Sequence, residues 1–188
     1  IEDDIYGDVC FTAERPRPIH AFDKSGNTIL CSSFSKTVSP TLRVGFVAAH
    51  PLLTTKISSM QGHSTSSLCP IAQKAGLAAL TGSMECVDKM REAFVRRRDM
   101  AMKVIEGWPF AICPKPDGAF YLFLDVSKCY GGSVSNSTDL CTLLLDKAHV
   151  AVVPGAAFGD DKCIRFSYAV GDDVLKGALE SIGAVLAE

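Results

Sequence analysis

Short apolar segments with the composition of buried strands alternate along the chain with longer segments of helical periodicity. Residues 28–32 and 43–48 are compact and rich enough in β-branched side chains to be buried strands. Residues 119–125, 150–153 and 163–168 are further strand candidates. Such alternation is typical of layered folds that combine helices with a sheet. We therefore predict an α/β fold, and 188 residues suffice for one domain or two small ones.

Helix starts are marked by proline and by a polar cap. Pro51 and Pro70 each stand where a helix can begin, because the first helical residue needs no amide donor, and the second helix would end near Gly82. The clearest helix runs from a Ser83 cap to Gly107, with apolar residues at spacings of three, four and seven. This long helix separates a strand–loop–strand region from an α+β region. We therefore place a domain boundary between residues 82 and 83.

Two more helices are expected near the C-terminus. One covers residues 137–148, and the last is capped by Asp172 or Asp173 and carries one apolar stripe. The charged run 96–98 on the long helix is most simply a solvated face.

Charge and composition exclude several classes of protein. With 19 Lys and Arg against 21 Asp and Glu, the net charge of −2 offers no footprint for nucleic acid or for an anionic membrane surface. Apolar runs are too short to span a bilayer, which indicates a soluble globular protein. The chain begins at Ile1 in the middle of a pattern and without a leader, so we expect it to be part of a longer one.

The eight cysteines lie at least twelve positions apart, so no C-x-x-C spacing for zinc or redox chemistry exists. An even count would allow disulfides, but the apolar surroundings of several cysteines favour free buried thiols in a reducing compartment, either the cytoplasm or an organellar matrix or stroma. The four histidines are also scattered, and no metal site is expected.

Three residues in the first part of the chain could bind and react with a flat heteroaromatic ligand, the first two by contacting its ring. Asp3 and Tyr6, an acid and a phenol three residues apart, end an extended segment. Lys36 lies in a loop directly after a strand, where partial desolvation would lower the pKa of its amine toward the range of a nucleophile.

Other groups could bind anions. The hydroxyls of Ser33 and Ser35 flank Lys36, and Arg43 would supply a fixed positive charge for a phosphate. Arg165 stands in an otherwise apolar strand, where burial calls for an anionic partner.

Each of these residues also has an ordinary structural interpretation. A loop lysine is usually exposed, a strand arginine usually forms an ion pair, and Asp3 with Tyr6 could be a turn cap and a core-edge tyrosine. Together they match the needs of pyridoxal phosphate (PLP): a Schiff-base lysine, an acid for the pyridine nitrogen and a cationic phosphate contact.

Five motifs in order resemble those of class I/II aminotransferases of fold type I, and the resemblance covers nearly the whole chain. The motifs are residues 3–6, 33–36 with 43–45, 118–121, 154–159 and 163–167. It implies that residues 1–82 form the C-terminal part of the large PLP-binding domain and that residues 83–188 form a small α+β C-terminal domain.

The resemblance also implies an activity, namely transfer of an amino group between an amino acid and a 2-oxo acid by a ping-pong route. Lys36 matches the lysine that forms the internal aldimine and then moves a proton. Asp3 matches the carboxylate that keeps the pyridine nitrogen protonated, and Tyr6 the phenol that bonds the cofactor's 3′ oxygen.

Further matches concern anion binding. Ser33, Ser35 and Arg43 match phosphate ligands, and Arg165 matches the arginine that grips the substrate α-carboxylate. Three aromatic residues, Tyr121, Phe158 and Tyr168, could line the substrate pocket or belong to the core.

The resemblance leaves alternatives open. The N-terminal half of the family's active site is absent, and residues up to 51 resemble aminoadipate or kynurenine-type members whereas residues 61–168 resemble aspartate or prephenate-type members. The family also implies a homodimer. A PLP-binding sensing domain of a GntR-type transcriptional regulator is the alternative function, and a catalytically inert fragment is a third possibility.

Overall fold

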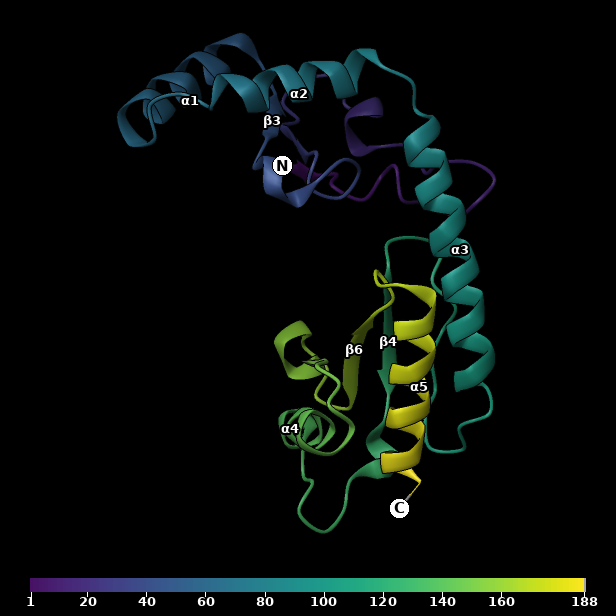
Figure 1. Cartoon of the computed structure of the whole chain (residues 1–188). Helices are drawn as coiled ribbons and strands as arrows, with labels where there is room; N and C mark the ends of the chain where they lie inside the picture. The colour runs from purple at the N-terminus through teal and green to yellow at the C-terminus, as the bar shows by residue number, and fades with distance from the viewer. Residues whose placement is uncertain (188) are drawn as a thin grey trace. The chain divides into compact units, whose positions relative to one another are not determined.

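A computed structural model describes residues 1–187 of the chain, which divide into two compact units (Figure 1). The first unit comprises Ile1–Arg91, and the second begins at Glu92. This division falls inside helix α3 (Glu85–Ile105), nine residues after the boundary expected between residues 82 and 83. The assignment of that expected boundary to two domains of the family stays a prediction.

The first unit is built on a three-stranded sheet in the order β1-β2-β3. Strand β1 (Glu2–Asp3) runs parallel to β2 (Leu30–Ser33), and β3 (Gly45–Ala48) runs antiparallel to β2. Two short 3-10 helices, η1 (Ile19–Ala21) and η2 (Pro40–Leu42), lie in the connections.

Helices α1 (Pro51–Ser64) and α2 (Pro70–Thr81) begin at the two prolines, as the sequence predicts. Helix α2 ends before Gly82, also as predicted.

The core of the first unit is small. Phe34, Val44 and Ala72 are buried together, and α2 approaches them closely through Gly76, where an added Cβ would lie 3.2 Å from Phe34 Cε2. The expectation of buried strands over residues 28–32 and 43–48 is wrong, because the residues of β2 are only half-buried and all four residues of β3 are exposed.

The second unit contains an antiparallel sheet in the order β4-β6-β5. The strands are β4 (Tyr121–Asp125), β5 (Val153–Pro154) and β6 (Cys163–Ser167). Strands β4 and β6 lie close to their predicted positions, whereas β5 shares only Val153 with the predicted strand 150–153. Helix α4 (Ser137–Ala148) matches the prediction at both ends, and α5 (Asp172–Leu186) lies beside the sheet in Figure 1. Two 3-10 helices, η3 (Ser127–Cys129) and η4 (Gly155–Phe158), complete the unit.

The two faces of this sheet differ. Alternate residues of β4 and β6 turn toward α3 and α5, where apolar side chains from all four elements surround one small cavity: Ile105, Leu124, Ile164, Phe166, Leu179 and Ile182. The other face carries the cross-strand pairs Phe123 with Arg165 and Asp125 with Cys163. The second unit therefore has a closed apolar face and a face that bears charged groups.

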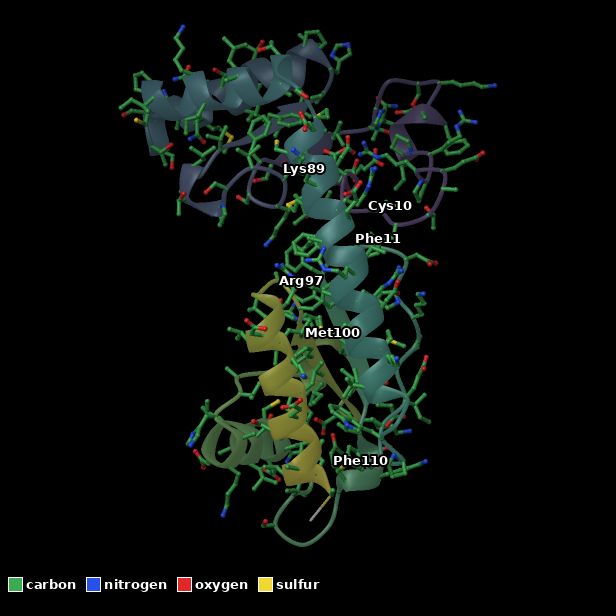
Figure 2. The ribbon with its side chains drawn as sticks, turned by 45° about the vertical axis from the view of Figure 1, so that its right-hand side comes forward. Cys10, Phe11, Lys89, Arg97, Met100 and Phe110 are labelled. Atoms are coloured by element: carbon green, nitrogen blue, oxygen red, sulfur yellow. The ribbon has the colours of Figure 1, made fainter. Side chains whose placement is uncertain are left out.

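Two expectations about charged residues of the second unit are corrected. The run 96–98 is not a solvated face, because Arg98 is only 7% exposed and donates to the Pro116 carbonyl oxygen at 3.0 Å. Arg96 and Arg97 both donate to Asp172, and Figure 2 shows Arg97 on α3 at the level where α5 begins. Asp172 and Asp173 do not cap α5, whose N-cap is Gly171; they form its first turn.

Among the described residues, no helix combines the length and the apolar character that a membrane crossing would need. All eight cysteines are free thiols, but the expectation that several are buried is wrong, since only Cys163 is buried and Cys69 and Cys86 are exposed.

Candidate functional site

The first unit gathers its candidate residues at one edge of the sheet. Strands β1 and β2 are parallel, so Asp3 and Ser33 lie at strand ends that point the same way. Because β3 is antiparallel and pairs Gly45 with Ser33, Arg43 precedes β3 at this same edge. Ligands of α/β folds bind outside the carboxyl ends of parallel strands. The fold thus brings together groups that stand up to forty positions apart in the sequence.

Lys36 sits on a short turn that the protein core anchors. The Phe34 side chain is buried, and the Phe34 carbonyl oxygen accepts hydrogen bonds from the amides of Val38 and Ser39 at 2.9 and 3.1 Å. Lys36 itself is half-buried, and its Nζ lies 5.7 Å from the centroid of the Tyr6 ring. The amine and the phenol ring are therefore neighbours, as a common ligand would require.

The hydroxyl groups of Ser33 and Ser35, which are predicted to bind an anion, lie next to each other. The Ser33 and Ser35 hydroxyl oxygens lie 2.9 Å apart, and Ser33 Oγ accepts from the Ser35 amide at 3.1 Å. Arg43 is exposed and adopts left-handed backbone geometry with φ of 53°. That conformation costs a non-glycine residue roughly 1 kcal/mol, and such strain concentrates at functional positions.

The donor set at this edge fits the cofactor that the sequence implies. An exposed carboxylate at Asp3 suits a protonated pyridine nitrogen, and the primary amino group of Lys36 suits an aldehyde. Hydroxyls and a guanidinium suit a phosphate. Ser33, Ser35, Arg43, Asp3 and Lys36 are thus the residues that could hold PLP.

The loop that carries Tyr6 is held by a residue that sequence reasoning missed. Arg15 forms ion pairs with Asp4 at 2.8 Å and Asp8 at 2.9 Å, on either side of Tyr6. A Cβ at Gly7 would overlap the Arg15 guanidinium, so the glycine leaves room for this bridge. No spacing signal marks Arg15 in the sequence, because the bridge depends on the path of the loop.

Strand β1 is held at its start by Glu2, which was also missed. The Glu2 carboxylate is 8% exposed and accepts from the Ile19 and His20 amides at 2.6 and 3.0 Å and pairs with His20 Nδ1 at 2.8 Å. Burial alone would raise the pKa of Glu2, but these hydrogen bonds and the His20 charge outweigh it and hold the pKa below its ordinary value. The residue next to Asp3 is therefore an ionised anchor.

Arg165 lies in the second unit, on the face of the sheet away from α5. Its guanidinium carbon is 4.4 Å from the centroid of the Tyr121 ring and 4.5 Å from that of Phe158. No acidic side chain within residues 1–187 forms an ion pair with it, and the predicted binding of a substrate carboxylate by Arg165 stays a prediction. Tyr168 is fully buried and donates to the Ala119 carbonyl oxygen at 3.1 Å, which makes it a core residue.

Comparison of the sequence with known proteins places the chain in one family. The sequence model of the family described as "Aminotransferase class I and II" matches residues 1–182. An aspartate aminotransferase of Pinus pinaster is 40% identical over 165 residues, which cover 82% of this chain and 34% of that protein. An aspartate/prephenate aminotransferase of Cereibacter sphaeroides is 36% identical over 190 residues, covering 97% of this chain and 47% of that protein.

Solved structures agree with these relatives. The crystal structure of the aspartate aminotransferase from Rhizobium meliloti matches with a TM-score of 0.91 and 31% identity, over 98% of this chain and 48% of that one. An aromatic aminotransferase from Pyrococcus horikoshii matches with a TM-score of 0.90 and 30% identity, over 98% of this chain and 50% of that one. The chain spans half or less of the length of these four proteins.

Proposed function

Because the chain belongs to the class I and II aminotransferase family, whose members use PLP, we propose that it binds PLP and transfers an amino group between an amino acid and a 2-oxo acid. The observation that carries this proposal is the convergence of Asp3, Lys36, Ser33 and Arg43 at one edge of the first sheet. The relatives named above are aminotransferases, which favours an enzyme over a sensing domain of a regulator.

When bound, PLP supplies an electron sink for negative charge that develops at the substrate α-carbon. The Asp3 carboxylate would hold a proton on the pyridine nitrogen, and the Tyr6 phenol would donate to the 3′ oxygen. Ser33, Ser35 and Arg43 would bind the phosphate through hydroxyl and charge-assisted hydrogen bonds.

Lys36 has two roles in this proposal. Its amine would hold the aldehyde end of PLP, and the same amine would take up and return a proton at the α-carbon of a bound substrate. A donor amino acid leaves as its 2-oxo acid before an acceptor enters, so the kinetics would be ping-pong.

Arg165 would bind the α-carboxylate of the substrate with two parallel N–H donors. The names of the four relatives cover aspartate, prephenate and aromatic substrates, which differ in side chain. Their amino-acid forms share an α-hydrogen and an α-carboxylate group, on which Lys36 and Arg165 respectively would act. We therefore propose the substrate class as α-amino acids with their 2-oxo acids.

The proposal extends to organisation. Residues 1–82 are assigned to the C-terminal part of the large PLP-binding domain and residues 83–188 to the small domain. A homodimer is proposed from the family, and eight free thiols support a reducing compartment.

Reductive labelling tests the cofactor site. After incubation with PLP and reduction with borohydride, peptide mass mapping is expected to find one pyridoxyl group per chain on Lys36. Lys36→Ala is expected to lose the label, whereas Lys24→Ala, at an exposed loop position of the same unit, should keep it. Label scattered over surface lysines with Lys36 unmodified would reject the site, and labelled protein that transfers no amino group from a panel of amino acids would reject the enzyme.

A further inference from the structure

Two aromatic rings contact the Arg165 guanidinium, whose charge in a partly buried strand is more often balanced by an acidic side chain. Its guanidinium lies over the rings of Tyr121, from β4, and Phe158, from η4, at nearly equal distances of 4.4 and 4.5 Å. We propose that Tyr121 and Phe158 are positioning residues that fix the Arg165 guanidinium plane and keep its N–H edge available to a carboxylate. This inference deepens the proposed function, since it rests on Arg165 binding a substrate carboxylate.

The chemistry of the contact distinguishes rings from an acidic partner. A guanidinium that stacks on an aromatic face is attracted through its π surface, and its five N–H donors stay in its own plane. A carboxylate partner would occupy those same donors and would compete with a substrate for them. The two ring contacts at 4.4 and 4.5 Å therefore compensate the positive charge without an acidic side chain that would compete for these donors.

Phe158 is fixed although it is not buried. Its side chain is 49% exposed, so apolar burial alone does not account for a phenylalanine there. Its ring meets Phe123 edge to face at 6.1 Å and 88°, and Phe123 is the cross-strand neighbour of Arg165. The two rings and the guanidinium form one contiguous group on the sheet face.

The backbone around Phe158 is also held in place. A Cβ at Gly155, the first residue of η4, would overlap backbone carbonyl oxygens, and Gly159 ends η4 with φ of 88°. After η4, Asp161 accepts from the Ser137 hydroxyl at 2.6 Å, while Tyr130 donates to the Asp161 carbonyl oxygen at 2.5 Å. The loop presents the Phe158 ring to Arg165 as part of a rigid scaffold.

The test follows the Arg165 side chain directly by NMR, in the full chain without cofactor. Succinate is titrated as a simple carboxylate probe while the Arg165 Nε–Hε signal is observed. In the wild type we expect a ring-current-shifted signal that moves on binding. Phe158→Leu keeps an apolar side chain but removes the ring, and is expected to abolish the ring-current contribution of Phe158 and to weaken succinate binding roughly five- to twenty-fold.

Matched variants separate positioning from folding. Phe158→Tyr keeps the ring face and should restore both the signal and the affinity. Phe22→Leu removes a comparable cation–π contact, Arg17 over Phe22 at 4.4 Å, from an exposed loop of the other unit and should change neither. Backbone amide spectra of the second unit that match the wild type would show that the Phe158→Leu protein is folded.

Two results would overturn the inference. One is succinate affinity in folded Phe158→Leu equal to that of the wild type. The other is a wild-type Arg165 signal that does not respond to succinate. Neither depends on the cofactor, so a failed Lys36 label rejects the PLP proposal and leaves this titration to be judged by itself.

Discussion

At the scale of single residues, Gly155 is the position with the least room for a side chain beside the candidate carboxylate site. An added Cβ would overlap the carbonyl oxygens of Asp160 and Cys163, and both atoms belong to backbone that cannot rotate away. Any larger residue must therefore move the loop that carries Phe158. Gly177, on α5, is the opposite case, because nothing lies within 4 Å of an added Cβ.

These two glycines give a paired prediction. Gly155→Ala is expected to lower the free energy of unfolding by about 1–3 kcal/mol or more through overpacking. Gly177→Ala is expected to raise it by roughly 0.5–1 kcal/mol, because alanine loses less backbone entropy in a helix. Urea unfolding followed by Trp108 fluorescence measures both. Equal effects of the same sign would contradict the packing argument.

Residue chemistry was predictable from the sequence only in part. Lys36, Ser33 and Arg43 stand close together in sequence around one strand–loop–strand segment, so their placement at one sheet edge follows from local structure. The partner of Arg165 was not predictable. An apolar strand sequence indicates that the positive charge of Arg165 must be balanced by some neighbour. The neighbouring rings come from β4 and η4, and only the register of the sheet and the path of η4 bring them next to Arg165.

At the scale of elements, β1 is a strand of two residues that gains its attachment from outside the sheet. The Glu2 carboxylate binds the first turn of η1 through the Ile19 and His20 amides, which links two segments seventeen residues apart. Since Asp3 follows directly, this link also sets where the strand ends.

The link makes part of the stability depend on pH. The folded-state pKa of Glu2 lies below its ordinary value of 4.5, so its contribution is fully present above about pH 4.5 and is lost as the pH falls through the folded-state pKa. Glu2→Gln cannot ionise. The urea midpoint of the wild type, followed by far-UV circular dichroism, is therefore expected to exceed that of the variant at pH 6.5, and the difference should shrink at pH 3.5.

Glu14→Gln, at an exposed position, is the control for this comparison and should show no such pH-dependent difference from the wild type. A Glu2→Gln difference that stays constant between the two pH values would mean that the carboxylate charge does not stabilise β1.

Helix positions were more predictable than strand environments. Pro70 and Gly82 bound α2, and Asn136 caps α4 by accepting from the Asp139 amide at 2.9 Å, so local signals fix both helices. Strand β3 was predicted in place but with the wrong burial, because an apolar pattern reports what a strand can bury and not what covers it. The N-cap of α5 was misassigned, since Asp172 serves Arg96 and Arg97 instead.

At the scale of the whole molecule, the two units differ in the size of their cores. The buried cluster of the first unit consists of Phe34, Val44 and Ala72. The second unit contains many side chains that are almost fully inaccessible, among them Leu122, Leu140, Leu144, Ile164, Leu175 and Leu179. Greater apolar burial gives the second unit the larger hydrophobic stabilisation.

Unfolding is therefore expected to occur in two steps, with the first unit unfolding at lower urea concentration. Trp108, the single tryptophan, belongs to the second unit and stacks on Phe110 at 5.6 Å, so its fluorescence should report the later transition while circular dichroism reports both. Val44→Ala should lower only the early midpoint. Leu179→Ala should lower only the late one, through a loss of about 2–5 kcal/mol in the free energy of unfolding of the second unit. Coincident transitions would indicate one cooperative unit.

The α/β class follows from alternation of elements and was predictable, whereas the division of the chain was harder to place. The contact boundary falls between Arg91 and Glu92, inside a helix whose apolar spacing continues without interruption. The boundary between the two units does not interrupt the apolar spacing of α3, so the sequence carries no signal that marks it.

The eight free cysteines give the protein a built-in set of chemical reporters with graded reactivity. Amides of Ala72 and Ile71 at the start of α2 lower the pKa of the exposed Cys69 thiol, which favours its reactive thiolate. Burial, reinforced by the Asp160 charge, raises the pKa of Cys163 to about 11, so this thiol stays protonated and unreactive near neutral pH. An alkylating reagent would thus mark Cys69 early and Cys163 only when its strand opens, and the order of modification would time the opening of the fold.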